Sequence, residues 1–322
     1  MSPYLFEIIV LVAGSIAGLV LARRGARRGA GQGDPSLEPR RRAIRAGGAW
    51  ACAIIVVFAL EWWFPTVAGL LGLRGTIDSM GYYQWWRYWP PVATAAIWTI
   101  IVAVTLARTR PAPLEPVRTA LRRTWRTYLR PSATWLTVAT LGVLAVTVLL
   151  AGLSSSPGEN GWFTVLKIPV GDQGSGFVSF PGWGHGVPVL LAAALLAVVA
   201  WRTLTVDALA PFRGLATIEA ETALRRAAAS TLLTGAAAGI LLGLGRLWLM
   251  IGGAGSGSVG VGIPGVGDFM FSPGYAAIAP AMGYAGAALE GLAFLLVARM
   301  VFAPVRIGAA RTEPLPAAVD AK

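Results

Sequence analysis

The chain has 322 residues, of which 56% are hydrophobic and 13% charged, with a mean hydropathy of +0.65. Soluble domains carry roughly 25% charged residues, so this composition argues against a soluble protein. The net charge of +12 could suggest a nucleic-acid partner, but the arginines lie between apolar stretches, so we expect none. One cysteine, Cys52, and one histidine, His185, leave no basis for a disulfide, a transition-metal site or another cofactor.

Seven apolar stretches are long enough to cross a bilayer as helices. We therefore predict an all-α polytopic membrane helix bundle forming a single transmembrane domain over residues 1–322. Residues 1–22 form an extra first helix, and residues 304–322 a cytoplasmic tail. The first stretch lacks the basic start and cleavage site of a signal peptide. The seven stretches are about Tyr4–Leu21, Ala43–Phe64, Pro91–Ala107, Ala133–Leu153, Val187–Leu204, Ala228–Ile251 and Tyr275–Phe302.

The sixth stretch, Ala228–Ile251, is expected to be the central packing helix. Gly235, Gly239 and Gly243 recur every fourth residue and so share one helix face. Small residues on a face allow close backbone approach, which drives helix packing in lipid. Gly14 and Gly18 have the same spacing in the first stretch and could serve an internal contact or a partner protein.

The basic residues predict the orientation. About 23 of them lie in, or within a few residues of, the connections after the first, third, fifth and seventh stretches, whereas the alternate connections contain only Arg74, Arg87 and Lys167. Because basic residues accumulate on the cytoplasmic side, we predict an N-out/C-in topology. The arginines would also contact anionic lipid at the cytoplasmic face.

Aromatic residues are concentrated at the opposite, outer ends of the stretches. An interfacial aromatic belt explains most of them, and a ligand cage is the alternative. The group includes Trp62, Trp63, Tyr82, Tyr83, Trp85, Trp86, Tyr88, Trp89, Trp162, Phe177, Phe180, Trp183, Trp248 and Tyr275.

Two outer connections resemble each other and indicate an internal repeat. One reads IPVGD from Ile168 and the other IPGVGD from Ile263. Inner segments share a Glu near an expected helix start, followed by Arg, and would form short surface helices. We infer parallel two-helix repeats over residues 37–108, 114–202 and 218–303, the first being the most degenerate.

Charged residues within the apolar stretches are candidate functional residues, because each is costly in lipid and calls for a partner. Arg246 and Glu290 lie in the last two stretches, which one outer loop joins. We predict a buried pair between them. The alternative is that Arg246 reaches the headgroups while Glu290 is protonated or bonded to a hydroxyl.

The outer connections contain three aspartates, Asp78, Asp172 and Asp268, which could attract cations at a pore mouth or simply cap turns. They are too few for a metal site of oxygen ligands. The glycine-rich run from Gly252 to Gly267 lacks the Lys-Ser/Thr of a phosphate loop and is expected to be a flexible loop. His185 is expected to be an ordinary interfacial residue, with pH sensing as the alternative.

The segments RTALRRTWRTYLRPSATWL, from Arg118, and ALRRAAASTLLT, from Ala223, resemble uncharacterised multi-span integral membrane proteins of high-GC Gram-positive bacteria. This resemblance implies a multi-pass protein of the bacterial cytoplasmic (plasma) membrane, and it assigns no site residue.

Two functions remain open from the sequence. A transporter, permease or permease-associated subunit would use the repeats and the buried Arg246 and Glu290. A non-catalytic structural or assembly subunit of a larger membrane complex, or a homo-oligomer, would use the small-residue faces. No catalytic motif or catalytic residue is recognised, so we do not expect an enzyme.

Overall fold

The computed structural model describes residues 88–108, 123–170, 174–212, 214, 218–263 and 267–302. The first two predicted spans, with Gly14 and Gly18, lie outside these residues. Within them, five helices are long and apolar enough to cross a membrane, and they match predicted spans three to seven. The helices are α4 (Pro90–Arg108), α5 (Pro131–Ser154), α6 (Trp183–Leu209), α7 (Ile218–Ser256) and α8 (Ala279–Phe302).

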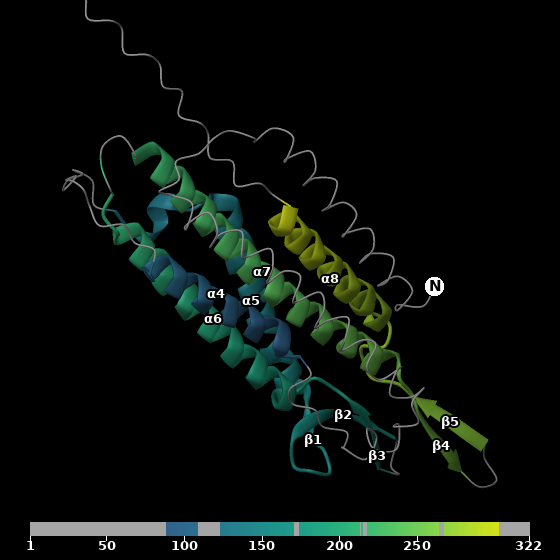
Figure 1. Cartoon of the computed structure of the whole chain (residues 1–322). Helices are drawn as coiled ribbons and strands as arrows, with labels where there is room; N and C mark the ends of the chain where they lie inside the picture. Colours follow the sequence, from purple (N-terminus) through teal and green to yellow (C-terminus); the bar gives the residue numbers. More distant parts are fainter. Residues whose placement is uncertain are drawn as a thin grey trace, which may run out of the picture.

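The helices form a bundle with α7 at its centre (Figure 1). Of the five, α7 is the most enclosed, with 78% of its most apolar window buried. It contacts α4, α5, α6 and α8, most extensively α8. The core that surrounds it consists mainly of Ala, Leu and Val side chains. The prediction that this stretch is the central packing helix is therefore confirmed.

Helix α7 also begins earlier than predicted. It starts at Ile218 with Glu219 and Glu221 in its first turn, where carboxylates favour the positive end of the helix dipole. The prediction of a separate surface helix before the sixth span is wrong, because α7 runs without a break from Ile218 into the bundle and has 39 residues.

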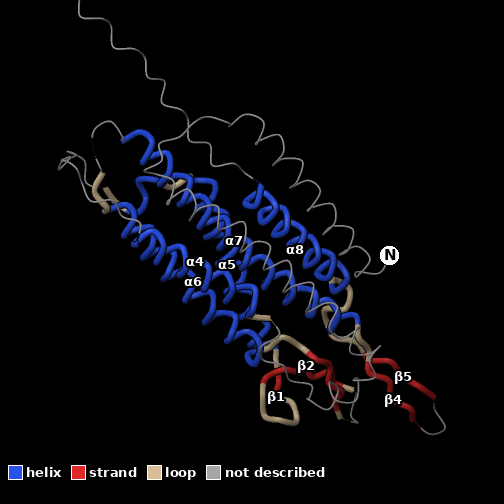
Figure 2. The backbone as a smooth tube through the Cα atoms, viewed as in Figure 1, coloured by secondary structure: helices blue, strands red, loops and turns tan. Residues whose placement is uncertain are grey.

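The described part is mostly helical, but the expected all-α class is wrong for the connections at one end. A three-stranded antiparallel sheet joins α5 to α6, in the order β1 (Ser156–Pro157), β2 (Phe163–Pro169) and β3 (Ser175–Ser179). A two-stranded hairpin, β4 (Val259–Ile263) and β5 (Gly267–Phe271), joins α7 to α8. Both strand groups lie at the same end of the bundle, which we call the hairpin end (Figure 2).

Local sequence explains these strands. The first strand of each hairpin is rich in β-branched residues, and in β4 Val259, Val261 and Ile263 recur at every second position, which is the period of a strand. The two hairpins also touch, because a Cβ added at Gly176 would collide with the side chain of Val259. The glycine-rich run is therefore not simply a flexible loop: it completes α7, forms β4 and begins β5.

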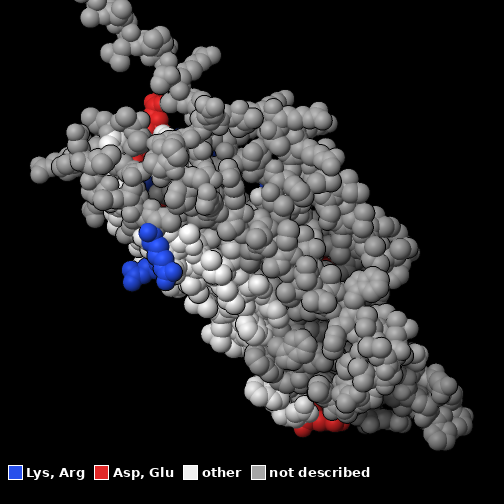
Figure 3. Space-filling view, in the orientation of Figure 1, with Lys and Arg blue, Asp and Glu red and all other residues white. Residues whose placement is uncertain are grey.

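The other end, which we call the arginine end, contains most of the described basic residues. The short 3-10 helix η2 (Trp125–Tyr128) lies there, before α5. In Figure 3, the visible basic atoms lie nearer this end, acidic atoms are visible at both ends, and a largely uncharged band of described residues lies between them. Basic residues at the arginine end are Arg108, Arg123, Arg126, Arg130, Arg202, Arg225, Arg226 and Arg299.

Candidate functional site

The structure brings Arg246 and Glu290 together between α7 and α8. Arg246 Nε lies 3.0 Å from Glu290 Oε1, and the two side chains are 19% and 0% exposed. A carboxylate removed from solvent in this way needs a compensating charge, which the guanidinium supplies. The pair predicted from the sequence is thus present as an ion pair, and it joins two consecutive long, apolar helices.

Glycines on both helices make room for this pair. A Cβ added at Gly245 would lie 2.8 Å from the carbonyl oxygen of Gly286, and one added at Gly286 would lie 2.7 Å from that of Gly245. Farther along, a Cβ at Gly252 would lie 2.6 Å from the backbone nitrogen of Gly283. The backbones therefore touch beside Glu290 and again toward the hairpin end, and α7 packs closely against α8 at Glu290.

The face predicted from Gly235, Gly239 and Gly243 packs against a different helix, α4. An added Cβ would lie 2.7 Å from Trp98 at Gly235, 2.6 Å from Ala95 Cβ at Gly239 and 3.0 Å from Val92 at Gly243. Helix α7 thus has two small-residue faces. The recurrence of glycine at every fourth residue predicted only the face that packs against α4.

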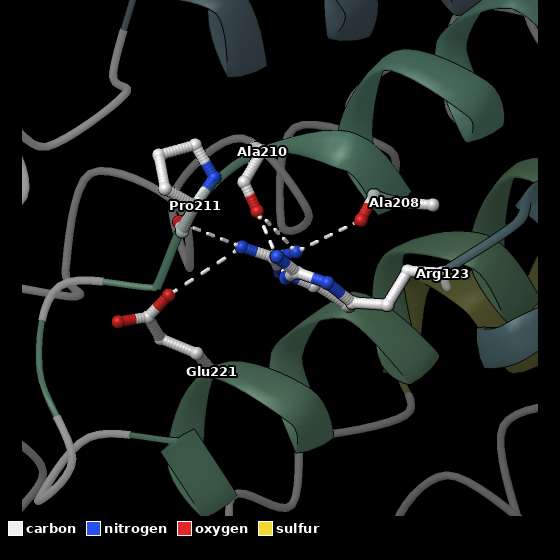
Figure 4. Close-up of polar contacts among 6 residues, drawn as sticks. Arg123, Ala208, Ala210, Pro211 and Glu221 are labelled. Atoms are coloured by element: carbon white, nitrogen blue, oxygen red, sulfur yellow. Dashed lines mark hydrogen bonds and ion pairs between the residues drawn. The ribbon is translucent and has the colours of Figure 1, made fainter. Parts of the chain in front are cut away.

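A second buried cluster, at the arginine end, is centred on Arg225 (Figure 4). Its guanidinium donates to the carbonyl oxygens of Ala208 at 3.4 Å, Ala210 at 2.9 Å and Pro211 at 3.1 Å. It also lies 3.6 Å from Glu221 Oε2, one turn back on α7. Because the last carbonyls of a helix have no partner within the helix, Arg225 caps the end of α6.

Arg123 reaches the same carbonyl from the segment before η2. Its Nη1 donates to the Ala210 oxygen at 3.1 Å. The guanidinium carbons of Arg123 and Arg225 lie 4.7 and 4.5 Å from the centre of the Phe212 ring. Two guanidiniums and one carboxylate therefore fasten η2, the end of α6 and the start of α7 together.

Sequence reasoning missed this cluster, since it placed these arginines at lipid headgroups. Arg225 is instead 1% exposed, and Glu221 is 2% exposed. The available signal was the spacing of Glu221 and Arg225, four residues apart, which places opposite charges side by side on a helix.

Two residues expected at the membrane interface, Tyr88 and His185, are in the interior, and a third, Trp248, is half-buried. His185 is 3% exposed and meets the Tyr88 ring edge-on, with centroids 5.1 Å apart. Tyr88 donates its hydroxyl to Met250 Sδ at 2.9 Å. Trp248 donates its indole N–H to Thr147 Oγ1 at 3.0 Å across α7 and α5. Trp162 and Phe177 are exposed at 54% and 56%, as a belt requires.

The proposed aspartate set cannot be placed. Asp78 and Asp172 lie outside the described residues. Asp268 pairs with Gly262 in the β4–β5 hairpin, but its side chain is outside what the structure describes. Among the described residues, no group of three or more His, Cys, Asp or Glu side chains could hold a metal ion.

Comparison with known proteins identified no relative of this chain. No protein-family model matches the chain, and neither a curated protein nor a solved structure shows significant similarity to it. The two buried clusters share one property. In each, the buried charged side chains interact with each other or with backbone carbonyls, and these contacts join neighbouring helices.

Proposed function

We propose that this chain is a non-catalytic membrane subunit whose helix bundle acts as a structural or assembly scaffold. One observation carries the proposal: the backbone contact of α7 with α8 closes around Glu290, whose side chain is 0% exposed. A transport path would instead place such a carboxylate beside a wet cavity. The Ala- and Leu-rich packing around α7 supports the same role.

A transporter or permease subunit is the second candidate. It is favoured by the presence of an ionisable Glu290 in the middle of a membrane-spanning helix, where such residues are costly and usually functional. It is also favoured by the repeat: Ile168 and Ile263 both fall at the end of the first strand of a hairpin that joins two long helices. Parallel repeats of this kind occur in transporters.

The finer topology is part of the proposal. We place the arginine end in the cytosol and the hairpin end outside a bacterial cytoplasmic membrane, with seven spans and an N-out/C-in chain. Basic residues at one end support this orientation. Arg126 and Arg202 lie 4.9 and 5.8 Å from the rings of Trp125 and Trp201, and such pairs suit an interface with anionic lipid.

Cysteine labelling in intact cells tests both the closed contact and the topology. In a Cys52→Ser background, we expect a water-soluble, membrane-impermeant maleimide to label Ser258→Cys, which is exposed at the hairpin end. Arg226→Cys, exposed at the arginine end, should react only after the cells are permeabilised. The reverse pattern would overturn the orientation.

The same reagent distinguishes scaffold from transporter. Ala293 is 0% exposed and lies one turn from Glu290, so Ala293→Cys leaves the ion pair intact. We expect neither Ala293→Cys nor Glu290→Cys to react in permeabilised cells. Fast labelling of Ala293→Cys, while Ser258→Cys reacts normally, would show a water-filled path and favour transport.

Copurification tests the assembly role directly. A scaffold subunit should leave the native membrane in mild detergent as part of a larger particle, either with other membrane proteins or as a homo-oligomer. Recovery of a monodisperse monomer from native membranes under the same conditions would count against the scaffold.

A further inference from the structure

A long apolar groove on the bundle surface is separate from both charged clusters. It has a volume of about 840 Å³ and lies between α5 and the start of α8, with α7 as its floor and β2 at the hairpin end. This volume is within the range of small-molecule binding sites. Along α5 the groove extends from Ala139 to Ser154, which is about 22 Å at the rise of an α-helix.

Polar side chains in the groove wall direct their hydrogen bonds into the protein. Trp248 donates to Thr147, and Ser154 donates to the carbonyl of Leu150. Tyr275 donates its hydroxyl to the carbonyl of Ile251 at 3.0 Å. The wall therefore offers an occupant mainly hydrocarbon surface along its length, which suits a chain of methylenes and suits a polar solute poorly.

A lysine on β2 lies at one end of this groove. Lys167 lies on β2 among the lining residues, and its side chain is exposed. Leu166 and Ile168 also line the groove, so β2 supplies apolar side chains to the wall and carries a lysine at the hairpin end of the groove. An apolar channel along the membrane normal with a positive charge at its headgroup end matches an anionic amphiphile.

We propose that this groove holds one acyl chain of an anionic phospholipid from the leaflet on the hairpin side, with Lys167 binding the headgroup phosphate. The length of the groove favours this occupant, because a lipid tail lies along the helices, from headgroup level toward the bilayer centre. The inference goes beyond the scaffold role and requires only that the bundle lies in a membrane.

Native mass spectrometry of the full chain, purified in mild detergent with phosphatidylglycerol or phosphatidylcholine, tests the site. We expect one retained phosphatidylglycerol per chain and at least fivefold less phosphatidylcholine. Lys167→Glu should lower phosphatidylglycerol retention at least fivefold, and Lys167→Arg should restore it. Equal retention of the two lipids, or no effect of Lys167→Glu, would overturn the proposal.

A second pair of variants tests the apolar part. Gly142 lines the groove and a Cβ there meets nothing within 4 Å, so Gly142→Phe introduces a ring at the groove. Ala145→Phe adds the same ring to an exposed position of α5 that does not line the groove. Gly142→Phe should displace the lipid while Ala145→Phe retains it. Equal retention in both variants would contradict the proposal.

The identity of the occupant in cells is settled by photocrosslinking. Benzoylphenylalanine at Val146, inside the groove, should capture phospholipid in native membranes. Capture of polypeptide instead, from this chain, a second copy or another protein, would show that the groove is a protein contact and would overturn the lipid assignment.

Discussion

Arg246 on α7 and Glu290 on α8 meet with Nε and Oε1 3.0 Å apart, inside a contact where glycines bring the two backbones together. The carboxylate has no exposure to solvent, so its charge depends on the guanidinium beside it. Two consecutive helices are thereby held in one register. A shift of one helical turn, about 5.4 Å, would separate the charges.

Removal of either partner of this pair should destabilise the bundle strongly. We expect Glu290→Gln or Arg246→Gln to lower the unfolding free energy by about 3 to 5 kcal/mol, because the remaining group is left buried without compensation. The double variant Arg246→Met/Glu290→Leu should lose less than either single variant. Unfolding in mixed micelles measures these differences, and additive losses would show that the two groups act independently.

The contact of α7 with α4 should tolerate no side chain at Gly239. A Cβ there would lie 2.6 Å from Ala95 Cβ and 3.1 Å from the Pro91 carbonyl oxygen. We expect Gly239→Leu to cost about 3 kcal/mol or more through overpacking. Gly253→Leu on the same helix is the control, because a Cβ at Gly253 meets nothing within 4 Å. Similar melting temperatures for the two variants would contradict this packing.

Arg225 should be irreplaceable as the cap of α6. We expect Arg225→Lys to lower stability by about 2 kcal/mol, because an ammonium cannot reproduce the planar fork that reaches three carbonyls. Its neighbour Arg226 is exposed, so Arg226→Lys should change stability by less than about 0.5 kcal/mol. Hydrogen exchange at the end of α6 should rise in the first variant alone.

Tyr275 should make stability sensitive to alkaline pH. Burial raises the pKa of Tyr275 to about 12 from its ordinary value of 10.0, because the phenolate is poorly solvated beside α7. The folded state therefore retains the proton where the unfolded chain releases it. The resulting stabilisation is complete below pH 10 and is lost as pH rises from 10 to 12. Tyr275→Phe lacks this titration, so its melting temperature should fall less over that interval than that of the wild type.

Helix positions were predictable because their signals are local. Long apolar runs match five described helices closely, and proline at the start of α4 and α5 marks where they begin. Glycine spacing identified α7 as the packing helix. A charge within each of two adjacent spans was enough to pair Arg246 with Glu290, since lipid offers such groups few other partners.

Tertiary contacts were harder to predict. The β4 strand was read as a loop because glycine occupies alternate positions and weakens the apparent strand propensity. Arg225 was assigned to lipid because its partners are backbone carbonyls at the end of α6 and just after it, which carry no sequence signature. His185 looked interfacial because it lies at the outer edge of the fifth apolar stretch, yet the adjacent Gly186 allows α6 to approach α5 closely: a Cβ at Gly186 would collide with Val148.

The unequal helix lengths have a consequence for hydrophobic mismatch. At 1.5 Å per residue, the 39 residues of α7 extend about 58 Å, whereas the 19 residues of α4 extend about 28 Å, close to the hydrocarbon thickness. In a bilayer, a change in thickness should therefore affect the ends of α4 more directly than those of α7, the helix at the centre of the bundle. Since α4 is the shortest of the five helices and packs closely against Gly239, we expect a thick bilayer to affect the ends of α4 first, so bilayer thickness should influence which membranes this protein favours.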